Sequence, residues 1–437
     1  MWFLEKYILL QFKKIYFILM FFFKENFIAI IFCKILFIIH YYITTTVNKY
    51  VPEPYMDEIF HMDQNRRYCN GNFTWNNKIT TPPAMYLLSY KFFCYNERYF
   101  NTFLYPLTFL ALLKFRRRYF KTIESIFLSY LNVICVIILP VFFQSTTLYY
   151  TDQLSLISIV LAFNSNPYLA TFFFTIAILT RQTNVVICLL YLGILFVKII
   201  DIKNPISSLL KFLKKAFLQI ILILLCILFV IFYNNGKIVL GDHSAHKPIL
   251  HFPQIFYFMT FCSVSTLPFF IFSIKKNIKL MYKNSLLSII LLFIINILIY
   301  KYTYAHPYLL ADNRHFTFYI WRRIINYHPY IKYVISPFYL LSFYYIINTL
   351  KKRIYPIIIL GGFISLALCI VPAGLLEFRY FIVHFALWRL SIHYNSKISL
   401  IGELLISLII NYIVMYLFLL KPFIWSSEPN NLQRFMW

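Results

Sequence analysis

The chain alternates between long apolar stretches and short polar connections over almost its entire length. A bilayer core of about 30 Å is crossed by roughly 20 helical residues. Apolar stretches near that length predict membrane-spanning helices close to 27–44, 100–113, 123–143, 184–200, 216–233, 254–274, 285–300, 331–350, 355–374 and 398–420. Two shorter stretches, Leu154–Phe163 and Tyr168–Leu179, predict two further spans, and Pro83–Tyr95 predicts an interfacial or re-entrant helix. The pattern predicts an all-α polytopic membrane protein, one integral-membrane domain over 1–437 with about twelve spans.

Composition narrows the class further. Apolar residues make up 61% of the 437 positions and charged residues only 13%, whereas a soluble domain carries about a quarter charged residues. These values exclude a soluble enzyme, a disordered chain and a small disulfide scaffold. The net charge of +26 resembles a nucleic-acid footprint, but in a membrane protein the position of the charges matters more than their sum. We therefore expect membrane lipid, and no nucleic acid, as a partner.

The basic clusters predict the orientation, because cytoplasmic loops are enriched in Lys and Arg. Clusters at 114–118, 198–215, 275–283 and 351–353 fall on one side of the predicted spans, together with the N-terminal lysines. That side is predicted to be cytoplasmic and to hold both termini. The opposite face is then formed by loops near 45–82, 144–152, 234–253, 301–330 and 375–397.

All ten His residues fall on or beside this opposite face in the predicted topology. His supplies acid–base chemistry near neutral pH, so we expect the active face here. The sequon Asn72-Phe73-Thr74 lies in the first of these loops and agrees with an extracytoplasmic position. Most Cys residues lie in apolar stretches, and only Cys69 and Cys94 come near this face, so we expect no disulfide framework.

The first loop of this face contains an acidic pair, Asp57-Glu58, followed by His61. A carboxylate near lipid is partly desolvated, which raises its basicity and suits a general base acting on a hydroxyl. The alternative is a solvated loop that happens to be acidic. The sequence leaves open which of the two carboxylates would act, and His61 is a candidate for contact with the acceptor.

Two further charged residues stand beside predicted spans. Asp152 ends the motif Tyr149-Tyr150-Thr151-Asp152 and is a candidate to orient an acceptor hydroxyl or, alternatively, to cap the following helix. Arg181 lies between two apolar stretches, where such residues face a cavity or an anion, or else reach back to the interface. A lipid phosphate would suit its bidentate guanidinium.

The segment from 241 to 254 contains Asp242, His243, His246, His251 and Gln254. Such a group of side chains is a candidate set of zinc ligands, but no Cys or HExxH helix supports a zinc site. We therefore predict no metal and no other cofactor. His251 and Gln254 are instead candidates for contact with a sugar or phosphate.

The densest polar segment runs from 306 to 323 and includes Asp312-Asn313-Arg314-His315 among aromatic residues. Arg and His neutralise phosphate, and aromatic faces stack on sugar rings. An interfacial aromatic belt with basic residues would explain the Tyr and Trp of this segment, but not Asp312-Asn313-Arg314-His315. Arg379, in the last loop of this face, is a candidate for the same anion site.

Taken in order, these segments resemble the dolichyl-phosphate-glucose-dependent alpha-1,2-glucosyltransferases of the endoplasmic reticulum. The matching stretches, which span 54–437, are PYMDEIFH, RYCNGNF, ITTPPAMYL, YYTD, LTRQTNVV, GDHSAHKPILHFPQIFYF, HPYLLADNRHFTFYIWRRI, LLEFRYFIV and QRFMW. His243 departs from the family, which usually has Lys there, and Asp152 stands where Glu also occurs. Both acids keep the charge at position 152.

The resemblance implies a GT-C-type bundle of about twelve transmembrane helices with a luminal active site in the endoplasmic reticulum membrane. The donor would be dolichyl phosphate glucose, and the acceptor a diglucosylated dolichyl-pyrophosphate-linked oligosaccharide. The reaction would invert a beta donor linkage into an alpha product. Asp57 or Glu58 would be the base, with Arg314, His315, Arg379, Arg181, His251 and Gln254 at the donor and Asp152 and His61 at the acceptor.

Two other classes remain alternatives at this stage. A transporter or lipid-linked sugar flippase would suit twelve spans, but such proteins often contain internal repeats, and the two halves of this chain show none. A non-catalytic regulator of another membrane protein would leave the same loops unchanged.

Overall fold

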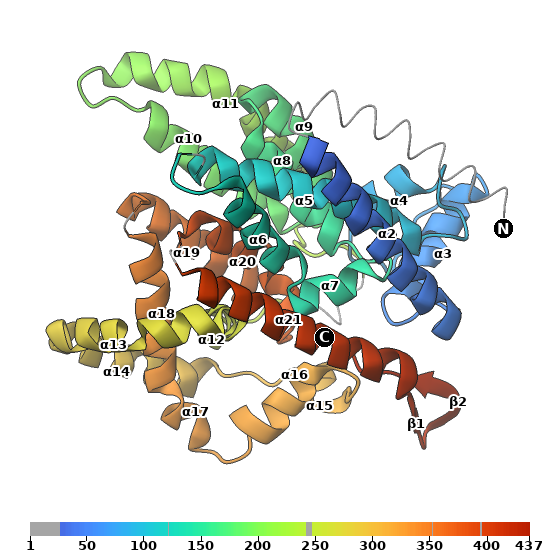
Figure 1. Ribbon diagram of the computed structural model, residues 1–437. Coiled ribbons are helices and arrows are strands. Elements are labelled where there is room, and N and C mark those ends of the chain that lie inside the picture. The colour runs from blue at the N-terminus through green and yellow to red at the C-terminus, as the bar shows by residue number, and fades with distance from the viewer. Residues whose placement is uncertain (1–26, 121, 242–246, 352, 394–395) are drawn as a thin grey trace.

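The computed structural model describes residues 27–120, 122–241, 247–351, 353–393 and 396–437 (Figure 1). The first half of the described chain contains α2 (Phe27–Tyr50), α3 (Glu58–Cys69), α4 (Ala84–Ser89), α5 (Arg98–Phe120), α6 (Ile126–Ile137), α7 (Pro140–Thr146), α8 (Asp152–Asn164), α9 (Pro167–Ile178), α10 (Asn184–Ile199), α11 (Pro205–Leu228) and η1 (Phe229–Tyr233). The second half contains α12 (Pro253–Ser265), α13 (Leu267–Lys283), α14 (Ser285–Tyr302), α15 (Pro307–Ala311), α16 (Phe316–Ile320), η2 (Trp321–Ile325), α17 (Ile331–Val334), α18 (Ser336–Leu350), α19 (Pro356–Ile370), η3 (Phe378–Phe381), α20 (Ile382–Ser391), α21 (Lys397–Leu420), β1 (Phe423–Trp425) and β2 (Glu428–Gln433).

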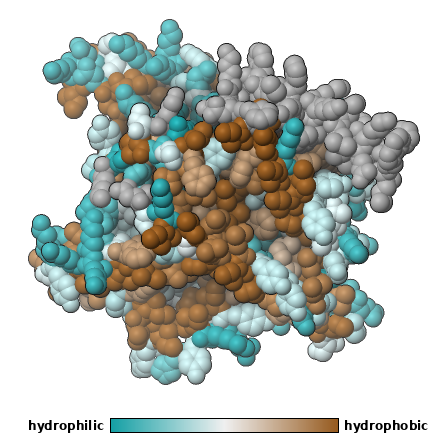
Figure 2. All heavy atoms as spheres, in the orientation of Figure 1, coloured by the Kyte–Doolittle hydropathy of each residue, from teal (hydrophilic) through white to brown (hydrophobic). Residues whose placement is uncertain are grey.

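The chain is an all-α membrane protein, as its apolar pattern predicts. Five helical segments in the described residues are long and apolar enough to cross a bilayer, namely Ile28–Tyr50, Pro205–Tyr233, Ser285–Tyr302, Ile331–Leu350 and Lys397–Leu420. Two bent helix pairs raise that number to as many as 7. Apolar side chains cover much of the face seen in Figure 2, and hydrophilic residues gather toward its edges.

Two stretches predicted as single spans are each broken into two helices. Between α6 and α7 the chain turns by 73°, and between α12 and α13 it turns by 110°. Pro140 begins α7 and Pro268 lies in the first turn of α13. Proline has no N–H to continue the preceding helix and disfavours helical geometry in the residue before it. Apolar length alone carries no sign of such a break.

The prediction that 375–397 forms one loop on a single face is wrong. Arg379 contacts the loop that precedes α3, whereas the carbonyls of Leu390 and Ile392 accept from Arg116 near the other end of α5. The loop that Arg379 contacts lies beside Arg98, the first residue of α5, because Glu58 binds Arg98. Arg98 and Arg116 are about 27 Å apart along the helix at 1.5 Å per residue. The short helix α20 therefore runs from one face of the bundle to the other. Its Arg389 is neutralised by Glu403 of α21, a tertiary partner that the local sequence does not reveal.

The C-terminal tail, residues 434–437, lies against the loop that precedes α3, where the N–H of Arg434 donates to the Tyr55 hydroxyl. Helix α21 runs back toward this end of the bundle after α20 and leads into β1 and β2 (Figure 1). The prediction that both termini share the face of the basic clusters is therefore wrong for the C-terminus, and the N-terminal residues lie outside the described part. His393 stacks on Phe120 beside Arg116. The prediction that His393 lies on the face opposite the basic clusters is therefore wrong.

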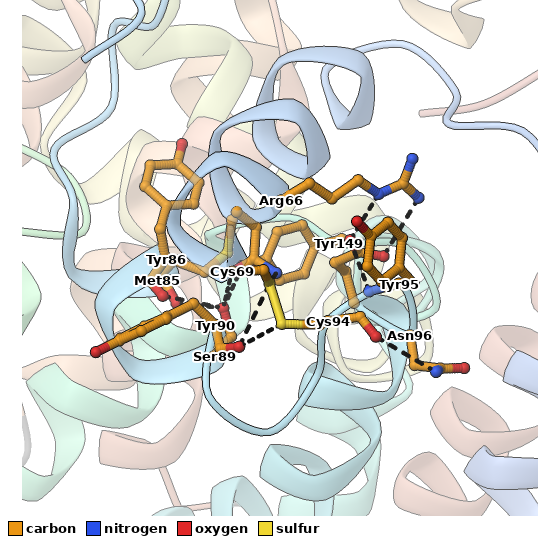
Figure 3. The surroundings of a disulfide bond; sticks show 12 residues. Arg66, Cys69, Met85, Tyr86, Ser89, Tyr90, Cys94, Tyr95, Asn96 and Tyr149 are labelled. Atoms are coloured by element: carbon orange, nitrogen blue, oxygen red, sulfur yellow. Dashed lines mark hydrogen bonds and ion pairs between the residues drawn. A yellow bond between two sulfur atoms is a disulfide. The ribbon is translucent and has the colours of Figure 1, made fainter. Parts of the chain in front are cut away.

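A disulfide joins Cys69 and Cys94, the two cysteines that the sequence places near this face, although no such pairing was predicted (Figure 3). The two residues are 25 positions apart in sequence, but α4 folds the intervening chain back so that their Cα atoms lie 6.0 Å apart. In the same cluster, the hydroxyl of Ser89 forms hydrogen bonds with the Asn65 side chain of α3 and the Tyr149 hydroxyl. The disulfide thus fixes the loop region that follows α3 against the rest of the bundle.

A small antiparallel hairpin, β1–β2, follows α21 and was not predicted. Phe423 pairs with Gln433 and Ile424 with Leu432. Beyond it, Arg434 donates to the carbonyls of Tyr50, Phe418 and Leu419. The tail is thereby anchored where α2 and α21 end.

Candidate active site

An ion pair between two distant loops forms the centre of the candidate site. Asp57 immediately precedes α3, and its Oδ2 accepts a hydrogen bond of 2.8 Å from Nη2 of Arg379. Arg379 lies in η3, where its Nε also donates to Glu377. The Asp57 side chain is 46% exposed and that of Arg379 only 10%. The carboxylate is therefore held by a buried cation and still open to a ligand.

A second ion pair continues from the first. Asp152, the first residue of α8, is almost fully buried, and its Oδ1 lies 2.9 Å from Nη2 of Arg181. Its Oδ2 lies 4.0 Å from Nη1 of Arg379. We call Asp57, Arg379, Asp152 and Arg181 the charge chain, because acids and cations alternate along it. Neither helix capping by Asp152 nor reach of Arg181 to the interface describes this arrangement, since the two residues bind each other.

The electrostatics of Asp57 follow from this arrangement. Burial raises the pKa of the Asp57 carboxyl. Arg379, and to a smaller extent His61 and His315, outweigh this effect and lower the pKa to about 2. The pKa of His61 is lowered to about 4, chiefly by burial, although Asp57 acts in the opposite direction. His61 Nδ1 forms a hydrogen bond of 2.7 Å with the Tyr86 hydroxyl. At neutral pH, Asp57 is ionised and His61 is a neutral polar neighbour.

Glu58, next to Asp57, points into a different environment. Its side chain is fully buried, and both carboxylate oxygens bind Arg98, at 2.9 and 2.6 Å. The same oxygens accept from the backbone N–H groups of Tyr149 and Tyr55. All strong acceptor directions of this carboxylate are thus used within the protein. Sequence reasoning missed Arg98, whose role depends on this contact between α3 and α5.

Arg314 and His315 lie between α15 and α16 and meet the C-terminal tail. Arg314 makes two hydrogen bonds of 2.8 Å to Asp312 and a third to Gln433. The backbone of Met436 pairs with that of Arg314 and Phe316. His315 is close enough to the site to lower the pKa of Asp57. The guanidinium of Arg314 is therefore already neutralised by a carboxylate.

His251 and Gln254 stand behind the site. Both side chains are fully buried, and burial lowers the pKa of His251 to about 4. The Gln254 amide donates to the carbonyls of Ala373 and Leu375. The Gln254 side chain and the backbone N–H of His251, which donates to the Val371 carbonyl, hold the chain segment that leads to Arg379. No hydrogen bond joins either side chain to Asp57 in the part of the chain that the structure describes.

The tail is the part of the site that sequence reasoning missed most clearly. Tyr55, two residues before Asp57, donates to the Arg434 carbonyl at 2.7 Å and accepts from its N–H at 2.8 Å. The N–H of Trp437 donates to Gln144 at 3.0 Å, and its ring lies against Phe378. The tail thus contacts the loop before α3, helix α7 and η3. Its closing motif, QRFMW, was the available signal.

The segment 241–254 contains the acid and histidines that prompted the question of a metal site. Among the described residues, no three His, Cys, Asp or Glu side chains are placed to hold a metal ion. Asp242, His243 and His246 lie outside the described residues.

Comparisons with known proteins agree on one family. The model of the DIE2/ALG10 family matches residues 51–390. A human Dol-P-Glc:Glc(2)Man(9)GlcNAc(2)-PP-Dol alpha-1,2-glucosyltransferase is 33% identical, covering 88% of this chain and 93% of its own length. Proteins of the same name from Arabidopsis thaliana and Drosophila melanogaster are 30% and 31% identical, over 90% and 87% of this chain and 96% and 93% of theirs. No solved structure matches. The chain belongs to the DIE2/ALG10 family, which confirms the resemblance found in its sequence.

Proposed function

We propose that this protein is an inverting alpha-1,2-glucosyltransferase that moves glucose from dolichyl phosphate glucose to a diglucosylated, dolichyl-pyrophosphate-linked oligosaccharide. The names of its relatives specify this donor and acceptor, and membership of the family supports the same reaction here. The observation that carries the proposal is the Asp57–Arg379 ion pair, an open carboxylate beside a buried cation.

In the proposed mechanism, Asp57 removes the proton from the 2-hydroxyl of the acceptor while the oxygen of that hydroxyl attacks the anomeric carbon of the donor glucose. The bond from that carbon to the phosphate oxygen breaks, and the phosphate leaves with the electron pair. Attack from the face opposite the leaving group inverts the beta linkage of the donor to alpha. Phosphate is a weakly basic leaving group, so it needs charge stabilisation more than a strong general acid.

The low pKa of Asp57 fits this mechanism if the donor binds beside Arg379. A phosphate near Arg379 and Arg181 competes with Asp57 and Asp152 for their guanidinium groups. Partial loss of the Arg379 contact raises the pKa of Asp57, because that contact is the largest influence lowering it. Donor binding would therefore make Asp57 a stronger base. His315 would be the next donor group along this face, and we assign Asp152 and His61 to the acceptor side of the site.

We assign the catalytic base to Asp57 in preference to Glu58. Glu58 is bound by Arg98 and two backbone N–H groups, so a hydroxyl would have to displace an existing partner to reach it. Asp57 has an exposed edge. His251 and Gln254 would act through the chain segment before Arg379, and not by contact with the donor.

We further propose that the face carrying Asp57 lies in the lumen of the endoplasmic reticulum. The Cys69–Cys94 disulfide follows Asp57 in the same loop region, and disulfides persist in oxidising compartments such as this lumen. The GT-C-type bundle of about twelve spans would be completed by the shorter apolar helices α8, α9, α10 and α19, together with α5.

A transfer assay with purified protein in detergent tests the function. Wild-type protein given dolichyl phosphate glucose and the diglucosylated acceptor should yield a product heavier by one hexose, and Asp57→Asn should not. A well-folded wild-type protein that binds both lipids and transfers nothing would contradict the enzyme and favour a flippase or a regulator.

A further inference from the structure

We infer that a cavity beside the C-terminal hairpin binds the sugar arm of the acceptor. This cavity, which we call the hairpin cavity, has a volume of about 630 Å³. Its walls come from the segment that follows α14 and from the turn between β1 and β2, and they include Tyr308, Asp312, Arg314, Phe318, Arg322 and Trp425. The inference rests on the proposed function and adds a subsite to it.

The Arg314–Asp312 pair in the wall of the cavity suits a carbohydrate better than a phosphate. Arg314 and Asp312 bind each other through two hydrogen bonds of 2.8 Å, so the pair offers directed donors and acceptors with little net charge. A phosphate would have to break both of these hydrogen bonds, whereas at Arg379 it would displace the single hydrogen bond from Asp57. Sugar hydroxyls can bind the remaining donors and acceptors of the Arg314–Asp312 pair without breaking it. Trp425 and the exposed Tyr308 add aromatic surface, which packs on the C–H faces of sugar rings.

The aromatic wall is held in place by specific contacts. The indole N–H of Trp425 donates to Asn313 Oδ1 at 2.7 Å, and the Arg314 guanidinium lies 4.7 Å from the centre of its ring. Arg314 also donates to Gln433 in β2. A ring fixed in this way loses little conformational entropy when a sugar binds.

The cavity is also tied to the reacting carboxylate. Arg434, directly after β2, exchanges two hydrogen bonds with Tyr55, which lies two residues before Asp57. His315 follows the wall residue Arg314 in sequence and lies near enough to Asp57 to lower the pKa of that carboxyl. Sugars held in the hairpin cavity would therefore extend from the hydroxyl that meets Asp57.

The size of the acceptor explains why such a subsite is needed. The relatives are named for an acceptor with two glucose, nine mannose and two N-acetylglucosamine residues on a pyrophosphate lipid. Its reacting sugar is separated from the lipid by many bonds, so membrane anchoring alone fixes its position poorly. The donor glucose, in contrast, is one phosphate away from its lipid. A grip on the acceptor arm supplies the missing orientation.

The test compares two tyrosines of the same segment. Tyr308 lines the cavity and is 55% exposed, whereas Tyr327 lies outside it and is 74% exposed. We expect Tyr308→Ala and Trp425→Ala to raise the KM for the acceptor roughly three- to tenfold, with kcat and the donor KM nearly unchanged. Trp425→Phe should recover most of the loss, and Tyr327→Ala should match wild type.

Binding of a free oligosaccharide separates this inference from the proposed function. A soluble arm fragment, with two glucoses on mannose, is added to detergent-purified protein and followed by saturation-transfer NMR. The NMR saturation transferred to the sugar protons should be lost in Trp425→Ala and Tyr308→Ala and kept in Tyr327→Ala. This result does not depend on whether the protein catalyses glucose transfer. Equal binding by all four proteins, or a rise in the donor KM alone, would overturn the inference. Wild-type protein that binds the fragment but lacks transfer would overturn only the proposed function.

Discussion

Two adjacent carboxylates of this site should fail in different ways when each is replaced by its amide. Glu58→Gln removes the charge that neutralises Arg98 in a fully buried environment. Asp57→Asn removes a half-exposed carboxylate whose partner, Arg379, keeps Glu377 as a second acid. We expect the first change to reduce stability and the second to reduce turnover.

The expected magnitudes follow from the contacts. Removing one member of a buried ion pair costs about 3–5 kcal/mol, because the remaining charge has no compensation. Glu58 also accepts from the N–H groups of Tyr55 and Tyr149, and an amide offers one acceptor where the carboxylate offers two. Loss of a general base lowers kcat by about 10²–10⁴. An ion pair between exposed side chains, in contrast, contributes at most about 1 kcal/mol to the free energy of unfolding.

The assay measures thermal unfolding and glucose transfer on the same detergent-purified samples. Asp63→Asn is the matched control, since Asp63 lies on α3 as well and pairs with Arg67 while 46% exposed. Asp57→Asn should unfold near the wild-type temperature and transfer almost no glucose. Glu58→Gln should unfold several degrees lower, and its folded fraction should retain activity. A Glu58→Gln protein of wild-type stability without turnover would refute the assignment of the base to Asp57.

Three further predictions test the surroundings of the site. Burial raises the pKa of Asp57, and Arg379 is the strongest influence that lowers it. Arg379→Gln should therefore move the acid limb of the kcat/KM profile to higher pH. An acid limb that does not shift would count against the Asp57–Arg379 ion pair. Cys69→Ser opens a loop of 25 residues and should cost about 3 kcal/mol, seen as a lower unfolding temperature that wild type matches only under reducing conditions. Asn72 is exposed, so protein made with microsomes should lose mass when treated with an N-glycosidase, and Asn72→Gln should not; a wild-type chain without glycan would argue against a luminal loop.

Local signals explain what the sequence predicted well. The length of an apolar stretch is a property of consecutive residues, so helices such as α14 and α21 were found close to their true positions. The short helix α20 was missed because it contains Arg389, whose charge is cancelled by Glu403. The disulfide was missed because its two cysteines meet only after α4 folds the chain back. A correct prediction of either feature would have required knowledge of a partner that is distant in sequence.

The candidate site shows the same division between residue type and partner. Asp57, Asp152, Arg181 and Arg379 were all singled out, and the structure joins them in one chain of charges. Asp57 and Arg379 are 322 positions apart, so no spacing rule could pair them. Adjacent residues at the start of a helix point about 100° apart, and for this reason Glu58 faces Arg98 while Asp57 faces Arg379.

One local signal bears on the anion site predicted at Arg314 and Arg379. Asp312-Asn313-Arg314 and Glu377-Phe378-Arg379 share the spacing acid-x-Arg, and in both the Nε of the arginine donates to the acid two residues before it. This contact fixes the guanidinium plane. In Arg314, Nη2 also binds Asp312 and Nη1 binds Gln433, whereas in Arg379 it is Nη2 that binds Asp57. Neither arginine is therefore an uncompensated cation waiting for a phosphate. Each is an oriented donor, and a donor lipid that binds here must exchange partners with a carboxylate, which is how binding at Arg379 would be transmitted to the base.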